Sequence, residues 1–102
     1  MKLSDVIHPI PYKDMVESLE RNGMFGVHKA NIPNTNYYIH LYSLNREVSS
    51  IGRDIRMIHA IIFARTSSDD AQTIMAIDVP CNIDGFKLIE NWFETVYKYI
   101  ND

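Results

Sequence analysis

The chain has 102 residues, with ten Lys or Arg against thirteen Asp or Glu and a formal net charge of −3. An acidic total works against the phosphate attraction that supplies most nucleic-acid affinity, so nucleic acid is a disfavoured partner. Cys81 is the only cysteine, which excludes an intramolecular disulfide and fits a reducing compartment. The hydrophobic share of 46% argues against disorder, and the length predicts a single domain over residues 1–102.

The first fourteen residues are unlike a secretion signal. Asp5, His8 and two prolines stand where such a signal needs an uninterrupted apolar stretch. No apolar run approaches the length of a membrane span. We therefore expect a cytoplasmic protein with no membrane partner.

The first predicted elements are a helix and a hairpin. Apolar residues spaced by three and four predict a short amphipathic helix from Tyr12 to Asn22, which Pro11 can start and Gly23 can end. The segments "MFGVHKA" and "YYIHLYSL" are rich in β-branched and aromatic residues. Because the turn formers of "NIPNTN" lie between them, they predict a β-hairpin.

The segment from residue 46 to 64 permits two interpretations. Val48, Ile51, Ile55, Ile58 and Ile62 follow spacings of three and four, which would suit one long helix. However, "MIHAIIFA" is typical of a strand, and the polar "RTSSDDAQ" separates it from the strand-like "TIMAIDV". We favour a short helix near 46–54 followed by a second hairpin.

The C-terminal segment gives the clearest pattern. Asp84 can cap a helix whose apolar residues form one stripe: Phe86, Ile89, Phe93, Val96, Tyr97 and Ile100. The order of elements is helix, hairpin, short middle helix, hairpin and long helix. It predicts an α+β fold with a mostly antiparallel sheet and helices packed on it.

This order resembles that of class I type III secretion chaperones and related small α+β proteins. In those families a helix precedes the strands, a middle helix interrupts them and a last helix follows a hairpin. The likeness covers Tyr12 to Ile100 and is closest in "QTIMAIDVPCNIDGFKLIENWFETV". It rests on element order and apolar pattern, and it implies dimeric protein binding without catalysis.

The predicted sheet is apolar on both faces. Met57, His59, Ile61 and Phe63 alternate along one strand with residues that are no more polar, and "YYIHLYSL" repeats this. An antiparallel sheet with one face in water should alternate polar and apolar residues, so both faces are expected to be covered. Either the two long helices lie on opposite faces, or a subunit or partner covers the face of Tyr38, His40 and Tyr42.

The last helix favours a partner. Besides its main stripe it carries Leu88, Trp92 and Tyr99 on flanking positions, which is more apolar surface than one contact face needs. We expect a homodimer, or a complex with another protein, through this helix or through the strand face of Tyr38 and Tyr42. Asp69 and Asp70 lie in the predicted turn between the last two strands and could meet a basic partner.

Two residue sets could carry chemistry instead. His28 and His40 lie at nearly mirrored positions about the first turn, and with His59 they could hold zinc if they converged. Cys81 precedes the last helix, whose positive end could lower the pKa of its thiol and make it a nucleophile. Strand histidines usually only pack and hydrogen-bond, and a lone cysteine is more often a small buried residue.

We therefore predict a non-enzymatic protein-binding module: a chaperone, an adaptor, or an inhibitor of the immunity type. We expect no cofactor and no metal. The partner is expected to be basic, because residues 66–102 hold seven Asp or Glu against two Lys or Arg. The alternative is a small enzyme or metal protein that uses the histidines or Cys81.

Overall fold

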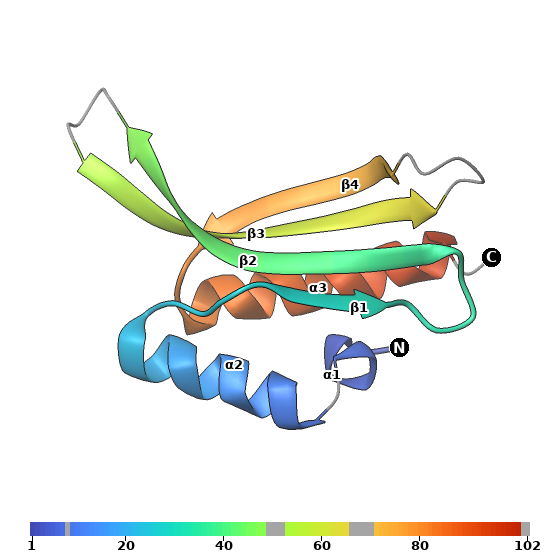
Figure 1. Ribbon diagram of the computed structural model, residues 1–102, viewed down its shortest axis with the longest axis horizontal. Coiled ribbons are helices and arrows are strands. Elements are labelled where there is room, and N and C mark those ends of the chain that lie inside the picture. Colours follow the sequence, from blue (N-terminus) through green and yellow to red (C-terminus); the bar gives the residue numbers. More distant parts are fainter. Residues whose placement is uncertain (8, 49–52, 66–70, 101–102) are drawn as a thin grey trace.

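The computed structural model describes residues 1–7, 9–48, 53–65 and 71–100. It consists of two N-terminal helices, a four-stranded antiparallel sheet and a C-terminal helix, which confirms the predicted α+β fold (Figure 1). The elements are α1 (Leu3–Val6), α2 (Pro9–Asn22), β1 (His28–Asn31), β2 (Tyr37–Val48), β3 (Arg53–Arg65), β4 (Ala71–Pro80) and α3 (Ile83–Ile100).

The helix α2 begins earlier than the sequence pattern predicts. It starts at Pro9 and includes Pro11, because the first N–H groups of a helix have no intrahelical partner and proline therefore costs nothing there. The helix ends at Gly23, which takes a left-handed conformation with φ of 67°. Its N–H donates to the carbonyl of Leu19 at 2.9 Å, which closes the last turn.

The strands follow the chain in the order β1-β2-β3-β4, each antiparallel to the next. The turn before β2 contains Asn34 at φ 62°, and the hydroxyl of Thr35 donates to the carbonyl of Ile32 at 2.8 Å. This local hydrogen bonding fixes the first hairpin, as the turn formers of the sequence predict.

The predicted short helix near 46–54 is wrong for the part that the structure describes. Residues 46–48 belong to β2 and residues 53 and 54 to β3, and the two strands pair up to Val48 opposite Arg53. Residues 49–52 lie outside the described residues. The β-branched isoleucines that mimic a helical spacing also suit a strand, and the long pairing with β2 decides between the two.

All helices of the described residues lie on the same side of the sheet (Figure 1). Of the two alternatives left open by the sequence, the one in which the two long helices lie on opposite faces is therefore wrong. The face toward the helices, here called the inner face, contributes fully buried side chains to one hydrophobic core. These residues are Ile39, Leu41, Ile58, Ala60, Ile62 and Val79.

The C-terminal helix completes this core from the other layer. Its buried residues are those of the predicted stripe, Phe86, Ile89, Phe93 and Val96, together with Gly85. The predicted cap is displaced by two residues: the side chain of Asn82, not Asp84, accepts the N–H of Gly85 at 2.7 Å. Gly85 is also where α3 touches β4, since a Cβ at this position would lie 1.9 Å from the carbonyl oxygen of Pro80.

Among the described residues, none of the helices combines the length and the apolar character that crossing a bilayer requires.

Candidate partner-binding surfaces

The face of the sheet that points away from the helices carries the tyrosines and histidines singled out in the sequence. In the pairing of β2 with β3, Tyr38 lies opposite Phe63, His40 opposite Ile61 and Tyr42 opposite His59. We call these six residues the outer sheet face. Each of them is half-buried, so the rings shield one another while part of each stays in contact with solvent.

Three of these rings form a compact cluster. The ring centroids of Tyr38 and Phe63 lie 5.2 Å apart with an interplanar angle of 19°. The His40 ring lies 5.2 Å from the first and 5.0 Å from the second. Aromatic pairs at such distances stabilise each other beyond the area that they bury. The cluster therefore forms a packed aromatic surface within the single chain.

Beside the cluster, the outer sheet face continues with a polar pair. The imidazole of His59 contacts the carboxylate of Asp78 on β4 and lies 5.3 Å from the ring of Tyr42. The side chains of His59 and Asp78 are 19% and 28% exposed, so water still reaches the pair. The face thus offers aromatic area together with a carboxylate.

The edge of this face is hollowed next to β1. An open hollow of about 280 Å³ is lined by Lys29, Ala30, Asn31, Tyr38 and His40. Burial, and after it the charge of Lys29, lowers the pKa of His40 below the usual value of histidine. The ring of His40 is therefore neutral near pH 7 and can donate or accept a hydrogen bond.

The three histidines do not converge. His28 pairs with Leu41 and lies on the inner face, whereas His40 pairs with Lys29 and lies on the outer one. Burial lowers the pKa of His28, with the charge of Asp14 acting in the opposite direction. Within the described ranges, no three His, Cys, Asp or Glu side chains lie close enough together to hold a metal ion. The hypothesis of a three-histidine zinc site therefore loses its geometric basis.

The environment of Cys81 is also unlike that of a nucleophile. The residue is half-buried in the link between β4 and α3, and its N–H donates to the carbonyl of Arg56 at 3.1 Å. Burial raises the pKa of the thiol, although the charge of Arg56 acts against this. The lowering by the helix end that a nucleophile would require is therefore not seen, and the raised pKa works against thiolate formation.

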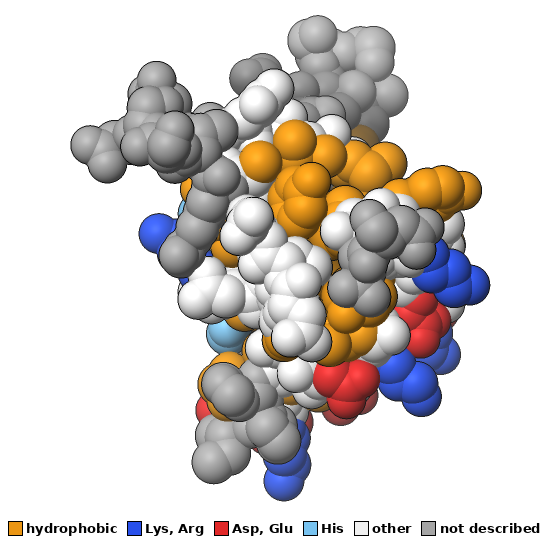
Figure 2. Space-filling model, turned by 90° about the vertical axis from the view of Figure 1, so that its right-hand side faces the viewer, with side chains coloured by type: hydrophobic (Ala, Val, Ile, Leu, Met, Phe, Trp, Pro, Cys, Tyr) orange, Lys and Arg blue, Asp and Glu red, His pale blue; other side chains and the backbone are white. Residues whose placement is uncertain are grey.

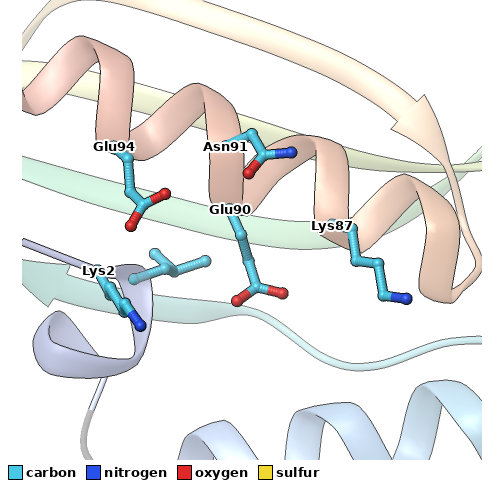
Figure 3. A pocket seen from close by; sticks show the side chains of 6 residues that line it. Lys2, Lys87, Glu90, Asn91 and Glu94 are labelled. Carbon is cyan, nitrogen blue, oxygen red and sulfur yellow. The ribbon is translucent and has the colours of Figure 1, made fainter.

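A second candidate surface lies on α3. Glu90 and Glu94 line a hollow together with Lys2 and Leu3, so this flank of the helix faces α1 (Figure 3). With 3.6 residues per turn, Leu88, Trp92 and Tyr99 lie on the opposite flank. That flank lies on the side of β4, the strand that α3 contacts most. Leu88 is 54% and Tyr99 75% exposed, whereas Trp92 packs partly against the core.

The first half of β4 adds to this second surface. Ile74 and Met75 are both 41% exposed, and a register shift interrupts the pairing of β4 with β3 between Ile62 and Phe63. Figure 2 shows the end of the molecule where β4 begins and α3 ends. Hydrophobic side chains gather in its upper part and charged ones in its lower part. We call Ile74, Met75, Leu88, Trp92 and Tyr99 the β4–α3 surface.

The hollow between α1 and α3 is polar. Its volume is about 270 Å³, and Lys2, Glu90, Glu94 and Lys87 bring charges of both signs to its lining (Figure 3). A larger groove of about 430 Å³ separates α2 from α3. At its side the hydroxyl of Tyr12 donates to Glu90 at 2.9 Å, and burial together with this carboxylate raises the pKa of Tyr12 to about 12. This hydrogen bond joins two helices and has a structural role.

The acidic residues of the segment 66–102, which led us to expect a basic partner, are only partly described. Asp69 and Asp70 lie outside the described residues. Asp78 stands on the outer sheet face, whereas Asp84, Glu90 and Glu94 belong to α3 on the other side of the sheet. Most of the described carboxylates of the C-terminal third are thus remote from the aromatic cluster.

Comparisons of the chain with protein-family models, with curated proteins and with solved structures give no match.

Five members of the two surfaces were not singled out as partner contacts in the sequence: His59, Ile61, Phe63, Ile74 and Met75. Phe63 completes the aromatic cluster, and the pairing of β2 with β3 could have indicated it had the register been known. Ile74 and Met75 lie in a strand whose neighbours are equally apolar, so no sequence signal separates exposed from buried positions there.

Proposed function

We propose that this chain is a non-enzymatic protein-binding module that holds a partner protein on the outer sheet face. The observation that carries the proposal is the cluster of Tyr38, His40 and Phe63 rings on a face away from the helices. A sheet face that serves only solvation is normally polar. Aromatic residues in such a place are typical anchors of protein interfaces.

The packing of the cluster supports this role. Because Tyr38 and Phe63 are stacked and His40 packs against both, the rings lose little further freedom when a partner covers them. Tyrosine and neutral histidine also present polar atoms at the rim of the apolar area, which can pair with the partner's backbone. The hollow beside Lys29 could receive one partner side chain.

Charge favours a basic partner. The chain has a net charge of −3, and Asp78 is the carboxylate that stands on this face among the described residues. Long-range attraction by the acidic chain would speed association with a basic protein, and the aromatic area would then provide the affinity.

The molecular role within this class is a chaperone, an adaptor, or an inhibitor of the immunity type acting in the cytoplasm. The order of N-terminal helix, antiparallel strands and C-terminal helix agrees with the resemblance described above, whereas the middle helix of those families has no counterpart among the described residues. In each of these roles the mechanism is occlusion or stabilisation of the partner, without covalent chemistry.

A comparison of two matched variants tests the proposal. Tyr42→Lys places a charge on the outer sheet face, and Thr95→Lys places the same charge at an exposed position of α3. Tagged wild-type and variant chains would be used to capture proteins from cells that naturally make the chain, with mass spectrometry to identify them. Binding of each purified candidate partner would then be measured by calorimetry.

We expect a partner whose affinity falls at least about tenfold with Tyr42→Lys and stays unchanged with Thr95→Lys, because a lysine at a desolvated aromatic contact is costly. Circular dichroism would verify that both variants are folded. A partner that binds both variants as well as the wild type would place the binding site elsewhere and contradict the proposal.

A further inference from the structure

The β4–α3 surface has the properties of an interface, because the edge of the sheet is not protected there. β4 is the last strand of the sheet, so one side of this ten-residue strand pairs with no other described strand. Proteins usually protect such an edge with lysines, prolines or a covering element. The described side chains of β4 include no lysine or arginine, and its proline is the final residue. The exposed Leu88 and Tyr99 of α3 stand on the same side.

The levels of β4 and α3 can be aligned from their point of contact. Gly85 of α3 touches Pro80 of β4. From this contact the two elements extend side by side, with opposite chain directions, because β4 ends here and α3 begins here. A strand rises about 3.3 Å per residue and a helix about 1.5 Å, so Ile77 and Trp92 both lie about 10 Å from this contact. These two residues, each packed partly against the core, therefore mark the same level of the surface.

We propose that a second copy of the chain binds here, with its β4 antiparallel to β4 and a two-fold axis near Ile77 and Trp92. The two sheets would then form one continuous sheet, and the two α3 helices would pack antiparallel beneath it. In this arrangement Trp92 meets its symmetry mate, and the exposed Leu88 and Tyr99 are covered. The inference is independent of the partner proposed for the outer sheet face.

The charged residues of α3 do not obstruct this contact. Asp84 and Lys98 are exposed, and with 3.6 residues per turn both point away from the sheet and from the flank of Trp92. Asp78, the charged residue of β4, contacts His59 on the outer sheet face and does not obstruct the edge.

The area is close to what a specific dimer needs. Ten strand residues form an edge about 30 Å long. Sheet and helix layers together are about 20 Å deep, so the contact would cover about 600 Å² per subunit. Typical specific interfaces bury about 800 Å² per partner. The register shift near Ile62 restricts regular strand pairing to the second half of β4. We therefore expect a dimer that dissociates on dilution.

The test is the oligomeric state of the wild type and four single variants, measured by sedimentation and light scattering. Trp92→Glu places a carboxylate at the centre of the interface. Leu88→Glu and Tyr99→Glu place the same charge at two exposed positions of this surface. Lys87→Glu on the flank toward α1 is the matched control.

We expect the wild type and Lys87→Glu to dimerise equally and Trp92→Glu to be a folded monomer. Leu88→Glu and Tyr99→Glu should each weaken self-association at least about tenfold, because a carboxylate in a desolvated contact is costly. A wild type that stays monomeric at high concentration would overturn the proposal. So would Leu88→Glu and Tyr99→Glu chains that dimerise as well as Lys87→Glu. This second criterion holds even if Trp92→Glu fails to fold.

Discussion

Residues 58 to 63 of β3 alternate between two environments that differ sharply. Ile58, Ala60 and Ile62 face the helices and have no exposed surface, whereas Ile61 and Phe63 on the outer sheet face are only half-buried. The residue types on the two faces are nearly equally apolar. The helices, and not the composition of the strand, therefore decide which face is fully buried.

The difference separates the residues that form the core from those that we propose bind a partner. The apolar character of the inner face is explained by the core that it forms with Phe86, Ile89 and Phe93. The outer sheet face is more aromatic than a solvated sheet face needs to be, and the packing of the helices gives no reason for it. The proposed binding of another protein would supply such a reason.

The largest expected effect comes from two neighbouring isoleucines. Ile62→Ala leaves a cavity under α3 and should lower the free energy of unfolding by about 2–5 kcal/mol. Ile61→Ala removes the same atoms from the outer sheet face and should cost less than half of that. Urea unfolding of both variants measures the difference. Equal losses would show that the outer face is as tightly packed as the inner one.

The attachment of the helix layer to the sheet depends on Gly85. A Cβ there would lie 1.9 Å from the carbonyl oxygen of Pro80 and 2.9 Å from its carbon, so backbone must move. Gly85→Ala should therefore destabilise the fold by about 1–3 kcal/mol. Gly26→Ala is the control, because a Cβ at Gly26 meets nothing within 4 Å. Thermal unfolding of both variants tests this, and a neutral Gly85→Ala would mean that α3 is not held at this contact.

The stripe of α3 illustrates what the sequence could predict. Its buried residues Phe86, Ile89, Phe93 and Val96 recur with the period of a helix, so a local pattern was sufficient. The short middle helix shows the limit of that reasoning. The strand from residue 53 is stabilised by pairing with β2, a contact between distant parts of the chain that a local spacing cannot reveal.

The candidate sites depended on features that the sequence leaves open. His28 and His40 appeared to mirror each other about the turn, but the actual register pairs His28 with Leu41. A shift of one residue moves a strand side chain to the opposite face, so His28 lies on the inner face and His40 on the outer one. Which face the helices would cover was equally undetermined, because a strand that is apolar on both sides gives no preference.

The polar part of the outer sheet face can be tested separately from its rings. Asp78→Ala removes the partner of His59 and should lower the free energy of unfolding by about 1 kcal/mol, a modest value because both side chains remain partly exposed. Asp78→Asn keeps a hydrogen-bond acceptor and should cost less. Chemical unfolding at low and high salt checks this, since the ionic share of the contact is screened by salt. A loss as large as that of Ile62→Ala would contradict the view that the core alone stabilises the fold.

The smallest expected effect is a dependence of stability on pH that involves both faces. Burial lowers the folded-state pKa of His28 on the inner side and of His40 on the outer side below the usual 6.5. The folded protein therefore binds these protons less readily than the unfolded chain. The neutral histidines favour the folded state fully above pH 6.5. This contribution to the free energy of unfolding is lost as the pH falls through the folded-state pKa values. The free energy of unfolding should thus decrease below pH 6.5, and His28→Gln and His40→Gln should each remove part of that decrease.

Titration of both rings by NMR measures the two pKa values directly. A pKa of His40 at or above 6.5 would show that its ring is not shielded by Tyr38 and Phe63, and that the aromatic cluster is more open to water than its packing indicates.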